Sequence, residues 1–291
     1  MNRIRLGTRG SPLALVQAGM VRDALSAAHG ITVEIVVIKT TGDRVQDRPL
    51  ADIGGKALWT KELDHALLSR EIDCAVHSMK DVETIRPAEI AIRAMLPRAD
   101  VRDRLIGAAS IAALPPGATV GTSSPRRRAQ LLRLRPDLAI VPFRGNVDTR
   151  LAKLAAGEAD ATMLAAAGLE RLARPDIGVA IDTGVMLPAP AQGAVGIEAR
   201  RDDDDTGALL AALDHAPTHR CVLIERAFLA ALNAGCHSPV AALAGDDGMI
   251  RAELFAGDGS VHVSGAGNDP VTLARELLDR APDDVRRLFA A

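Results

Sequence analysis

The sequence predicts a mostly parallel α/β protein with two similar lobes and a third, smaller domain. Strand-like and helix-like segments alternate along the chain, which is typical of this class. One strand–loop–helix pattern also occurs twice, which indicates a duplicated unit. With 291 residues and 48% hydrophobic content, the chain is long enough to form two or three cores.

The first copy of the pattern lies at the N-terminus. Residues 4–6 predict a short strand, residues 7–10 a loop, and Ser11 followed by Pro12 the start of a helix. Serine is a favoured N-cap, and proline is a favoured first helical residue. A helix is therefore expected from Ser11 onward.

The second copy has the same order, with a strand at 118–121 and a helix start at Ser124 and Pro125. A further repeat supports duplication: a helix at 63–68 precedes a strand at 74–76, and a helix at 151–155 precedes a strand at 161–164. We infer two similar lobes.

Proline-containing segments at 96–98 and 187–190 predict two crossings between the lobes. We expect a first lobe of residues 1–96 with 191–214, a second lobe of residues 97–190, and a C-terminal domain of residues 215–291. In the last domain, a helix from 218 to 232 is expected to precede a loop around Cys236, followed by short strands and terminal helices.

Composition excludes several classes of function. The net charge of -2, from 35 basic and 37 acidic residues, gives no global attraction to nucleic acid or to a membrane surface. No apolar run approaches the roughly 20 residues of a membrane span, and the first residues lack the apolar core of a signal peptide, so a cytoplasmic protein is expected. The three cysteines lack paired zinc-ligand spacing, so neither a metal site nor a disulfide framework is expected.

Three consecutive arginines, Arg126 to Arg128, stand in the first turn of the second Ser-Pro helix. Cations at this positive helix end are unfavourable by about 0.3–1 kcal/mol each when exposed, so an anion is expected nearby. Backbone N–H groups, the hydroxyls of Thr122 and Ser123, and the guanidinium groups could hold a carboxylate or a phosphate. The alternative is an exposed basic turn without a ligand.

Further arginines follow predicted strands. Arg9 occupies the corresponding loop of the first lobe, and Arg144 with Gly145 follows the strand-like segment 138–143. Arg150 lies on the next helix. Because parallel strands present ligand groups at their carboxyl ends, these arginines could converge on one crevice. The alternatives are a surface salt bridge for Arg9 and a solvated helix face for Arg150.

The strand at 74–76 is followed by polar residues that end in Asp81, whereas the equivalent strand is followed by the apolar residues 165–168. Asp81 is therefore the candidate catalytic carboxylate, with capping of the next turn as the alternative. His77 is interpreted as structural.

Two other segments allow two interpretations each. Residues 54–56 do not form a phosphate-binding loop, because Leu50 and Ala57 replace the required glycine and hydroxyl residue. Lys56 could belong to a mobile cover or to a surface turn. Cys236 follows a glycine in a small-residue loop and could face a cavity or be a buried, inert thiol.

Taken together, these segments resemble the porphobilinogen deaminase family, in order from about residue 4 to residue 244. The segments that carry the resemblance are residues 7–14, 77–82, 121–124, 144–147, 187–194 and 235–236. The resemblance implies two lobes like type II periplasmic binding proteins and a small C-terminal α/β domain. It also implies a transferase that condenses four porphobilinogen units head to tail into hydroxymethylbilane, with release of ammonia, in the tetrapyrrole (haem) pathway.

In this family a dipyrromethane cofactor primes the reaction, and the resemblance assigns its thioether to Cys236. Asp81 corresponds to the catalytic aspartate. The implied cofactor-binding residues are Ser78, Lys80, Asp81, Thr122, Ser123, Arg126, Arg127, Arg144 and Gly145. The implied substrate-binding residues are Arg9, Ser11, Gln17, Lys56, Arg150 and Gln192. The expected partners are porphobilinogen and oligopyrrole intermediates, and the expected state is a monomer.

The residues themselves agree with this implication. Each pyrrole carries two carboxylates, so a growing oligopyrrole needs many guanidinium and hydroxyl donors. Some positions depart from the family pattern: Pro125 and Arg128 flank the arginine pair, Trp59 replaces a frequent Phe, and Glu83 replaces a common Pro. The main alternative is a non-catalytic binding protein for an anionic metabolite, which would not need Cys236. A phosphoryl-transfer enzyme is a weaker alternative.

Overall fold

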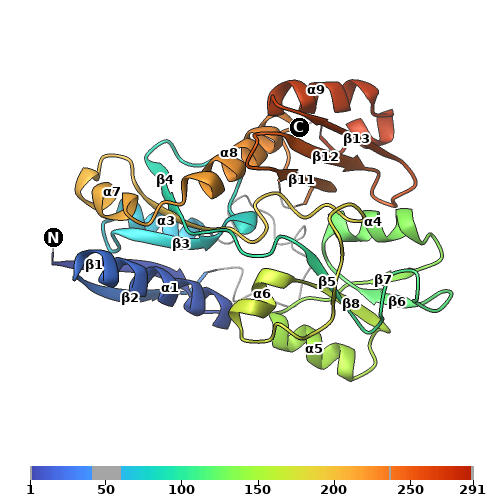
Figure 1. Cartoon of the computed structure of the whole chain (residues 1–291), viewed down its shortest axis with the longest axis horizontal. Helices are drawn as coiled ribbons and strands as arrows, with labels where there is room; N and C mark the ends of the chain where they lie inside the picture. The colour runs from blue at the N-terminus through green and yellow to red at the C-terminus, as the bar shows by residue number, and fades with distance from the viewer. Residues whose placement is uncertain (1, 41–59, 236, 290–291) are drawn as a thin grey trace. The chain divides into compact units, whose positions relative to one another are not determined.

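The structure is a computed structural model that describes residues 2–40, 60–235 and 237–289. Helices and strands alternate along most of the chain (Figure 1). The chain forms two compact units: unit 1 comprises residues 1–99 and 193–219, and unit 2 comprises residues 100–192 and 220–291. The chain thus passes between the units near the two predicted crossings, after residues 99 and 192, and a third time after residue 219. Whether residues 215–291 form a separate third domain stays a prediction.

Unit 1 is built on a five-stranded sheet with the order β2-β1-β3-β10-β4. Its strands are β1 (Arg3–Arg9), β2 (Thr32–Ile38), β3 (Cys74–Ser78), β4 (Ile90–Met95) and β10 (Val195–Arg200). Its helices include α1 (Pro12–His29), α3 (Lys61–Leu68) and α7 (Asp204–Ala211), and a short 3-10 turn, η2 (Met79–Asp81), follows β3. Buried apolar residues of α1, β1, β3 and β10 form its main core.

The helix start at Ser11 and Pro12 is confirmed, since Ser11 is the N-cap of α1 and its hydroxyl accepts a hydrogen bond from the Ala14 N–H. The loop predicted at 7–10 is wrong in part. Strand β1 continues to Arg9, because all seven of its residues pair in parallel with β2. Only glycine fits at position 7 without a shift of its neighbours, because a side chain there would collide with Ile72: a Cβ would lie 2.3 Å from its Cδ1.

Unit 2 contains a second five-stranded sheet with the order β7-β6-β8-β5-β9. Its strands are β5 (Asp103–Ile106), β6 (Thr119–Gly121), β7 (Ala139–Val141), β8 (Ala161–Ala165) and β9 (Val179–Ala180). The helices that alternate with them are α4 (Pro125–Leu134), α5 (Val147–Ala155) and α6 (Ala166–Arg171). Ser124 is the N-cap of α4, as predicted.

The two sheets confirm the predicted duplication. In each, a central strand (β1 or β6) pairs in parallel with the next strand along the chain and with a third strand (β3 or β8). That third strand pairs with a single antiparallel strand, β10 or β5, supplied from a distant part of the chain. Four strands of each sheet therefore share one direction, and the mixed α/β class is confirmed.

The C-terminal part of unit 2 is an antiparallel sheet of β11 (Val240–Ala244), β12 (Ile250–Phe255) and β13 (His262–Gly267). The helices α8 (Ala216–Ala231), α9 (Pro270–Arg280) and α10 (Asp283–Arg286) accompany it. Apolar residues of α8, α9 and this sheet form one buried core that includes Phe228, Leu254 and Leu277.

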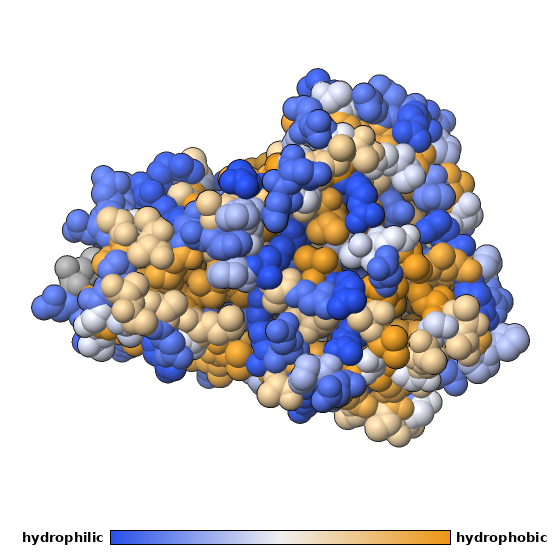
Figure 2. Space-filling view, in the orientation of Figure 1, coloured by the Kyte–Doolittle hydropathy of each residue, from blue (hydrophilic) through white to orange (hydrophobic). Residues whose placement is uncertain are grey.

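The surface over α1 is hydrophobic in part (Figure 2), and Leu15, Val16 and Met20 of this helix are exposed. Isolated apolar residues on a surface are normal in folded proteins. Within the described residues, no helix combines the length and the apolar character needed to cross a membrane.

Candidate active site

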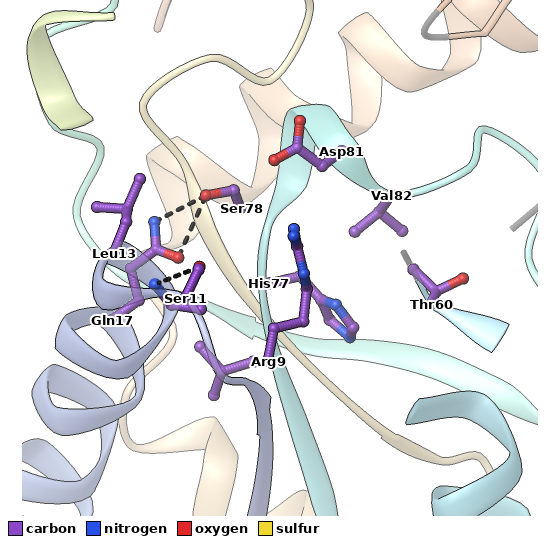
Figure 3. A pocket seen from close by; sticks show the side chains of 11 residues that line it. Arg9, Ser11, Leu13, Gln17, Thr60, His77, Ser78, Asp81 and Val82 are labelled. Atoms are coloured by element: carbon purple, nitrogen blue, oxygen red, sulfur yellow. Dashed lines mark hydrogen bonds between the residues drawn. The ribbon is translucent and has the colours of Figure 1, made fainter. Parts of the chain in front are cut away.

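A pocket of about 60 Å³ lies in unit 1 at the carboxyl ends of β1 and β3. Its wall combines the end of β1, the first turns of α1, the end of β3 and the turn η2 (Figure 3). Five of the predicted site residues line it: Arg9, Ser11, Gln17, Ser78 and Asp81. The sheet topology thus brings together polar residues from two strand ends, as expected for parallel strands.

Asp81 ends the three-residue turn η2, directly after β3. Its side chain is half-buried, and no hydrogen bond or ion pair joins its carboxylate to any residue that the structure describes. It does not cap a following helix, which removes the alternative interpretation. Figure 3 shows the Arg9 side chain extending toward the side of the pocket on which Asp81 lies. The carboxylate is therefore available to a ligand.

Two of the predicted substrate-binding residues already bind protein atoms. The buried Gln17 side chain donates from Nε2 to Oγ of Ser78 at 2.8 Å, and its Oε1 lies 3.2 Å from the same hydroxyl oxygen. Ser11 caps α1 through its hydroxyl oxygen, which leaves its O–H able to donate to an anion. Gln17 thus orients Ser78, while Ser11 lies at a helix end that favours negative charge.

The second group of predicted residues lies in unit 2. Ser123 donates from its hydroxyl to the Phe143 carbonyl at 2.9 Å, and Arg150 donates from Nε to the Gly145 carbonyl at 3.0 Å. Thr122 accepts a hydrogen bond from the Ser124 N–H. These contacts connect the end of β6, the loop after β7 and the first turn of α5.

Arg126 and Arg127 are paired with a carboxylate of the chain itself. Both guanidinium groups are buried, and they donate to the two oxygens of Asp103 at 2.8 and 2.7 Å. Arg126 also donates to the Leu187 carbonyl, and Arg127 to the Met163 carbonyl. The anion expected at this helix end is thus present as Asp103, and the binding of cofactor by these two arginines stays a prediction.

Asp103 is a strongly stabilised carboxylate. Burial alone would raise its pKa, but the charges and hydrogen bonds of Arg126 and Arg127 outweigh burial and hold the pKa well below its ordinary value. The Gln192 amide also donates to Asp103, at 2.9 Å, and is 1% exposed. Three of the predicted binding residues therefore belong to one internal cluster.

Sequence reasoning did not single out Asp103. Asp103 lies on the same face of β5 as the buried Leu105, but this alternation of buried and half-buried residues is visible only in the structure. A carboxylate on a buried face requires a partner, and Arg126 and Arg127 supply it.

In Arg144 a terminal guanidinium nitrogen, Nη1, is buried without a hydrogen-bond partner among the described residues, whereas in Arg126 and Arg127 only Nε is. Arg128, in contrast, is exposed. Lys80 follows β3 and is half-buried. Two predicted residues, Lys56 and Cys236, lie outside the described residues.

The fold and the pocket define an α/β protein that presents arginine, serine and one uncommitted carboxylate at strand ends, which suits an enzyme acting on an anionic substrate. Two family models match the sequence. "Porphobilinogen deaminase, dipyromethane cofactor binding domain" matches residues 4–208, and "Porphobilinogen deaminase, C-terminal domain" matches residues 219–280. The chain belongs to the porphobilinogen deaminase family.

Curated relatives agree with this assignment. The chain is 59% identical to a porphobilinogen deaminase of Sphingopyxis alaskensis, with 99% of this chain and 97% of the relative covered. It is 52% identical to a porphobilinogen deaminase of Paracoccus denitrificans, with 97% and 96% covered. Among solved structures, it is similar to an ancestral cationic amino acid solute-binding protein at 15% identity, with a TM-score of 0.47 and coverage of 72% of this chain and 87% of that chain.

Proposed function

We propose that this chain catalyses the condensation of four porphobilinogen molecules into hydroxymethylbilane. In each step, the C–N bond of an aminomethyl group breaks and ammonia leaves. A C–C bond then forms to a pyrrole carbon, and that carbon loses its proton. Water releases the completed chain. The observation that carries the proposal is the uncommitted carboxylate of Asp81 in a pocket with Arg9 and Ser11, in a member of this family.

The residues present fit a dipyrromethane cofactor. The buried Nη1 of Arg144 has no hydrogen-bond partner within the described chain, which suits an acidic side chain of a bound pyrrole. Ser11 and Lys80 would supply further donors, and the hydroxyls of Ser78 and Ser123 would do so by exchanging their present hydrogen bonds to Gln17 and to the Phe143 carbonyl. When bound through Cys236, the cofactor would supply the primer to which substrate is added.

Arg9 would bind a substrate carboxylate. A guanidinium group offers a rigid fork of donors that matches a carboxylate, and the positive end of α1 at Ser11 adds to the attraction. Gln17 would hold the Ser78 hydroxyl in place through their hydrogen bond of 2.8 Å. These residues account for local anion binding in a chain whose net charge is -2.

Asp81 would act on the reacting pyrrole. Loss of ammonia leaves positive charge on the substrate, and a fixed carboxylate stabilises that charge as it develops. The same carboxylate could accept hydrogen bonds from pyrrole N–H groups and later take the proton of the attacked carbon. No other carboxylate lines the described part of the pocket.

Intact-protein mass spectrometry tests the proposal. The purified chain should be heavier than its sequence by two linked pyrrole units, and Cys236→Ser should lose this increment. Cys221→Ala is the matched control, because Cys221 is buried in α8 and should leave the increment unchanged. A wild-type mass equal to the sequence mass, without turnover of porphobilinogen, would instead indicate a binding protein.

A cytoplasmic location, a monomeric state and the three-domain division remain predictions. The monomeric state is what the family resemblance implies. The separate C-terminal sheet and its own core support the third.

A further inference from the structure

A buried ionic network adjoins the wall of the Asp81 pocket, and the proposed mechanism does not use it. At its centre is Arg86, whose side chain is 9% exposed and contacts three carboxylates. It pairs with Asp64 of α3, donates to Glu83 at 3.0 Å, and donates to Glu198 of β10 at 2.9 and 2.8 Å. One side chain thus joins a helix, a strand and the segment that follows Asp81.

The network reaches the pocket at two residues. Thr60 lines the pocket, accepts a hydrogen bond from Nη1 of Arg86 at 3.1 Å, and donates one to Glu83 at 2.6 Å. His77 also lines the pocket, and its Nε2 lies 3.2 Å from Oε2 of Glu198. Both residues border the pocket that Asp81 shares (Figure 3).

The sheet explains why Glu198 can reach His77. Antiparallel pairing places Glu198 opposite Ala75 and Gly196 opposite His77, so all four residues point to one face. Gly196 has no side chain, and the side chain of Met79 fills the space beside it, while Glu198 and His77 are diagonal neighbours on the same face. The register between β10 and β4 shifts next to Glu198, which is an irregularity often found beside functional sites.

Glu198 is ionised although it is fully buried. Burial would raise its pKa, but His77 and Arg86 together lower it to about 2. Burial likewise opposes the charge of Arg86, yet its contacts with Glu198 and Asp64 raise its pKa above the ordinary value. Glu198 and Arg86 therefore form a buried pair of fixed charges at neutral pH.

The position of the turn that ends at Asp81 depends on hydrogen bonds and ion pairs on both sides of it. On one side, the Met79 N–H donates to the Ala194 carbonyl at 3.1 Å, and Met79 is buried against Gly196. On the other side, Glu83 and Arg86 are held by the network two and five residues after Asp81. Because the Asp81 carboxylate has no described partner of its own, the flanking backbone must fix its position.

We propose that Arg86 is a positioning residue, which holds the turn Met79–Asp81 and the pocket wall at Thr60 and His77 so that Asp81 meets the reacting pyrrole in a fixed place. The inference rests on the proposed function for its kinetic consequence, but its structural consequence is independent of that function. A displacement of about 1 Å can lower the rate about 100-fold without removing any contact to substrate.

Two variants test the inference. Arg86→Lys keeps the charge but cannot bridge the carboxylates, because lysine lacks the planar fork of donors. The triple variant Arg86→Met with Glu198→Gln and Asp64→Asn removes the charge of Arg86 together with those of its two most buried partners, which protects folding, because replacing all members of a buried ionic group is tolerated better than removing one. Arg135→Lys is the matched control: Arg135 belongs to unit 2, pairs with Asp137 and donates to the carbonyls of residues 111–115.

Hydrogen–deuterium exchange of the peptide spanning residues 79–86 is the readout that does not need turnover. We expect about tenfold faster exchange in both Arg86 variants and unchanged exchange in Arg135→Lys. We also expect the kcat for porphobilinogen to fall at least about tenfold, with KM changed less than about twofold and with the cofactor mass retained.

Wild-type exchange rates in Arg86→Lys would overturn the inference. So would an unchanged kcat with a raised KM, because Arg86 would then act on binding. An equal loss of kcat in Arg135→Lys would also overturn it, because the effect would follow general destabilisation. A wild-type protein that does not turn over porphobilinogen would instead refute the proposed function, while the exchange result would still decide the structural claim.

Discussion

Asp81 and Asp103 are two carboxylates with opposite surroundings. Asp103 is buried and accepts hydrogen bonds from Arg126, Arg127 and Gln192, which lowers its pKa and fixes it as an ion. Asp81 is half-buried and has no partner among the described residues. A buried carboxylate that pairs with arginines cannot be removed without leaving their charges uncompensated, whereas an unpaired one can interact with charge that develops on a substrate.

Asp81→Asn tests the catalytic role at this scale. The amide has nearly the same shape but cannot stabilise positive charge or accept a proton, so single-turnover ammonia release should fall about 100-fold or more. Because Asp81 has no described partner to lose, the midpoint of thermal unfolding should stay within about 2 °C of the wild type. A near-normal single-turnover rate would remove Asp81 from the mechanism.

Helices α1 and α4 start in the same way, but their first turns have different roles. Both have a serine N-cap followed by proline. The first turn of α1 contributes to the pocket wall, whereas the first turn of α4 places Arg126 and Arg127 on Asp103 of strand β5. The positive end of α4 is thereby neutralised within unit 2, and the pair ties the helix to the sheet.

Asp103→Asn should weaken this connection between helix α4 and strand β5. The amide leaves two buried guanidinium groups without a counter-charge, so the free energy of unfolding at neutral pH should fall by about 3–5 kcal/mol. Because the folded-state pKa is lowered, the stabilisation is present above the ordinary pKa of 3.8 and is lost as the pH falls below it. The difference between wild type and variant should therefore shrink in acid.

Urea unfolding at several pH values measures this difference. Asp100→Asn is the control, because its pair with Arg102 is partly exposed and should contribute less than about 1 kcal/mol. Equal losses of unfolding free energy in the two variants would show that the buried Asp103 cluster contributes no more to stability than the partly exposed pair of Asp100 and Arg102.

At the scale of the whole molecule, the two duplicated sheets differ in the residues that follow their corresponding strands. Strand β3 leads into the turn that ends at Asp81, whereas its counterpart β8 leads directly into helix α6, whose first residues are apolar. Both units nevertheless contain donors suited to an anion, such as Arg9 in unit 1 and Arg144 in unit 2. A net charge of -2 means that this attraction is local.

The cofactor should therefore contribute to the stability of the whole chain. Cys236→Ser should unfold at a midpoint at least about 5 °C below the loaded wild type, because the ligand's carboxylates would pair with donors that only the folded state presents. Differential scanning calorimetry measures the midpoint. Incubation with porphobilinogen should not restore that of the variant, and equal midpoints for loaded and unloaded protein would contradict the prediction.

Much of the fold could be predicted because its signals are local. Ser11 and Ser124 mark both helix starts, and the two repeated patterns revealed the duplication that the sheets confirm. The prediction at residues 7–10 was wrong because β1 extends through Arg9, where pairing with β2 overrides the loop signal of Gly7. Sheet pairing depends on a partner strand that the local sequence does not reveal.

The site was predictable in part. The positions of Arg9, Ser11, Ser78 and Asp81 beside one pocket follow from the rule that parallel strands end at the same edge. The partner of Arg126 and Arg127 could not be foreseen, since Asp103 lies more than 20 residues away and meets them only in the folded chain. The network around Arg86 was missed for the same reason.

The sequence by itself determined the order of strands and helices, the helix caps, the family and the residues that carry polar chemistry, because each is recorded in neighbouring residues or in ordered motifs. Only the tertiary structure decided which charged groups pair with one another within the protein and which stay available to a ligand. Long-range pairing is set by sheet register and burial, and it commits Arg126 and Arg127 to Asp103 while leaving Asp81 open.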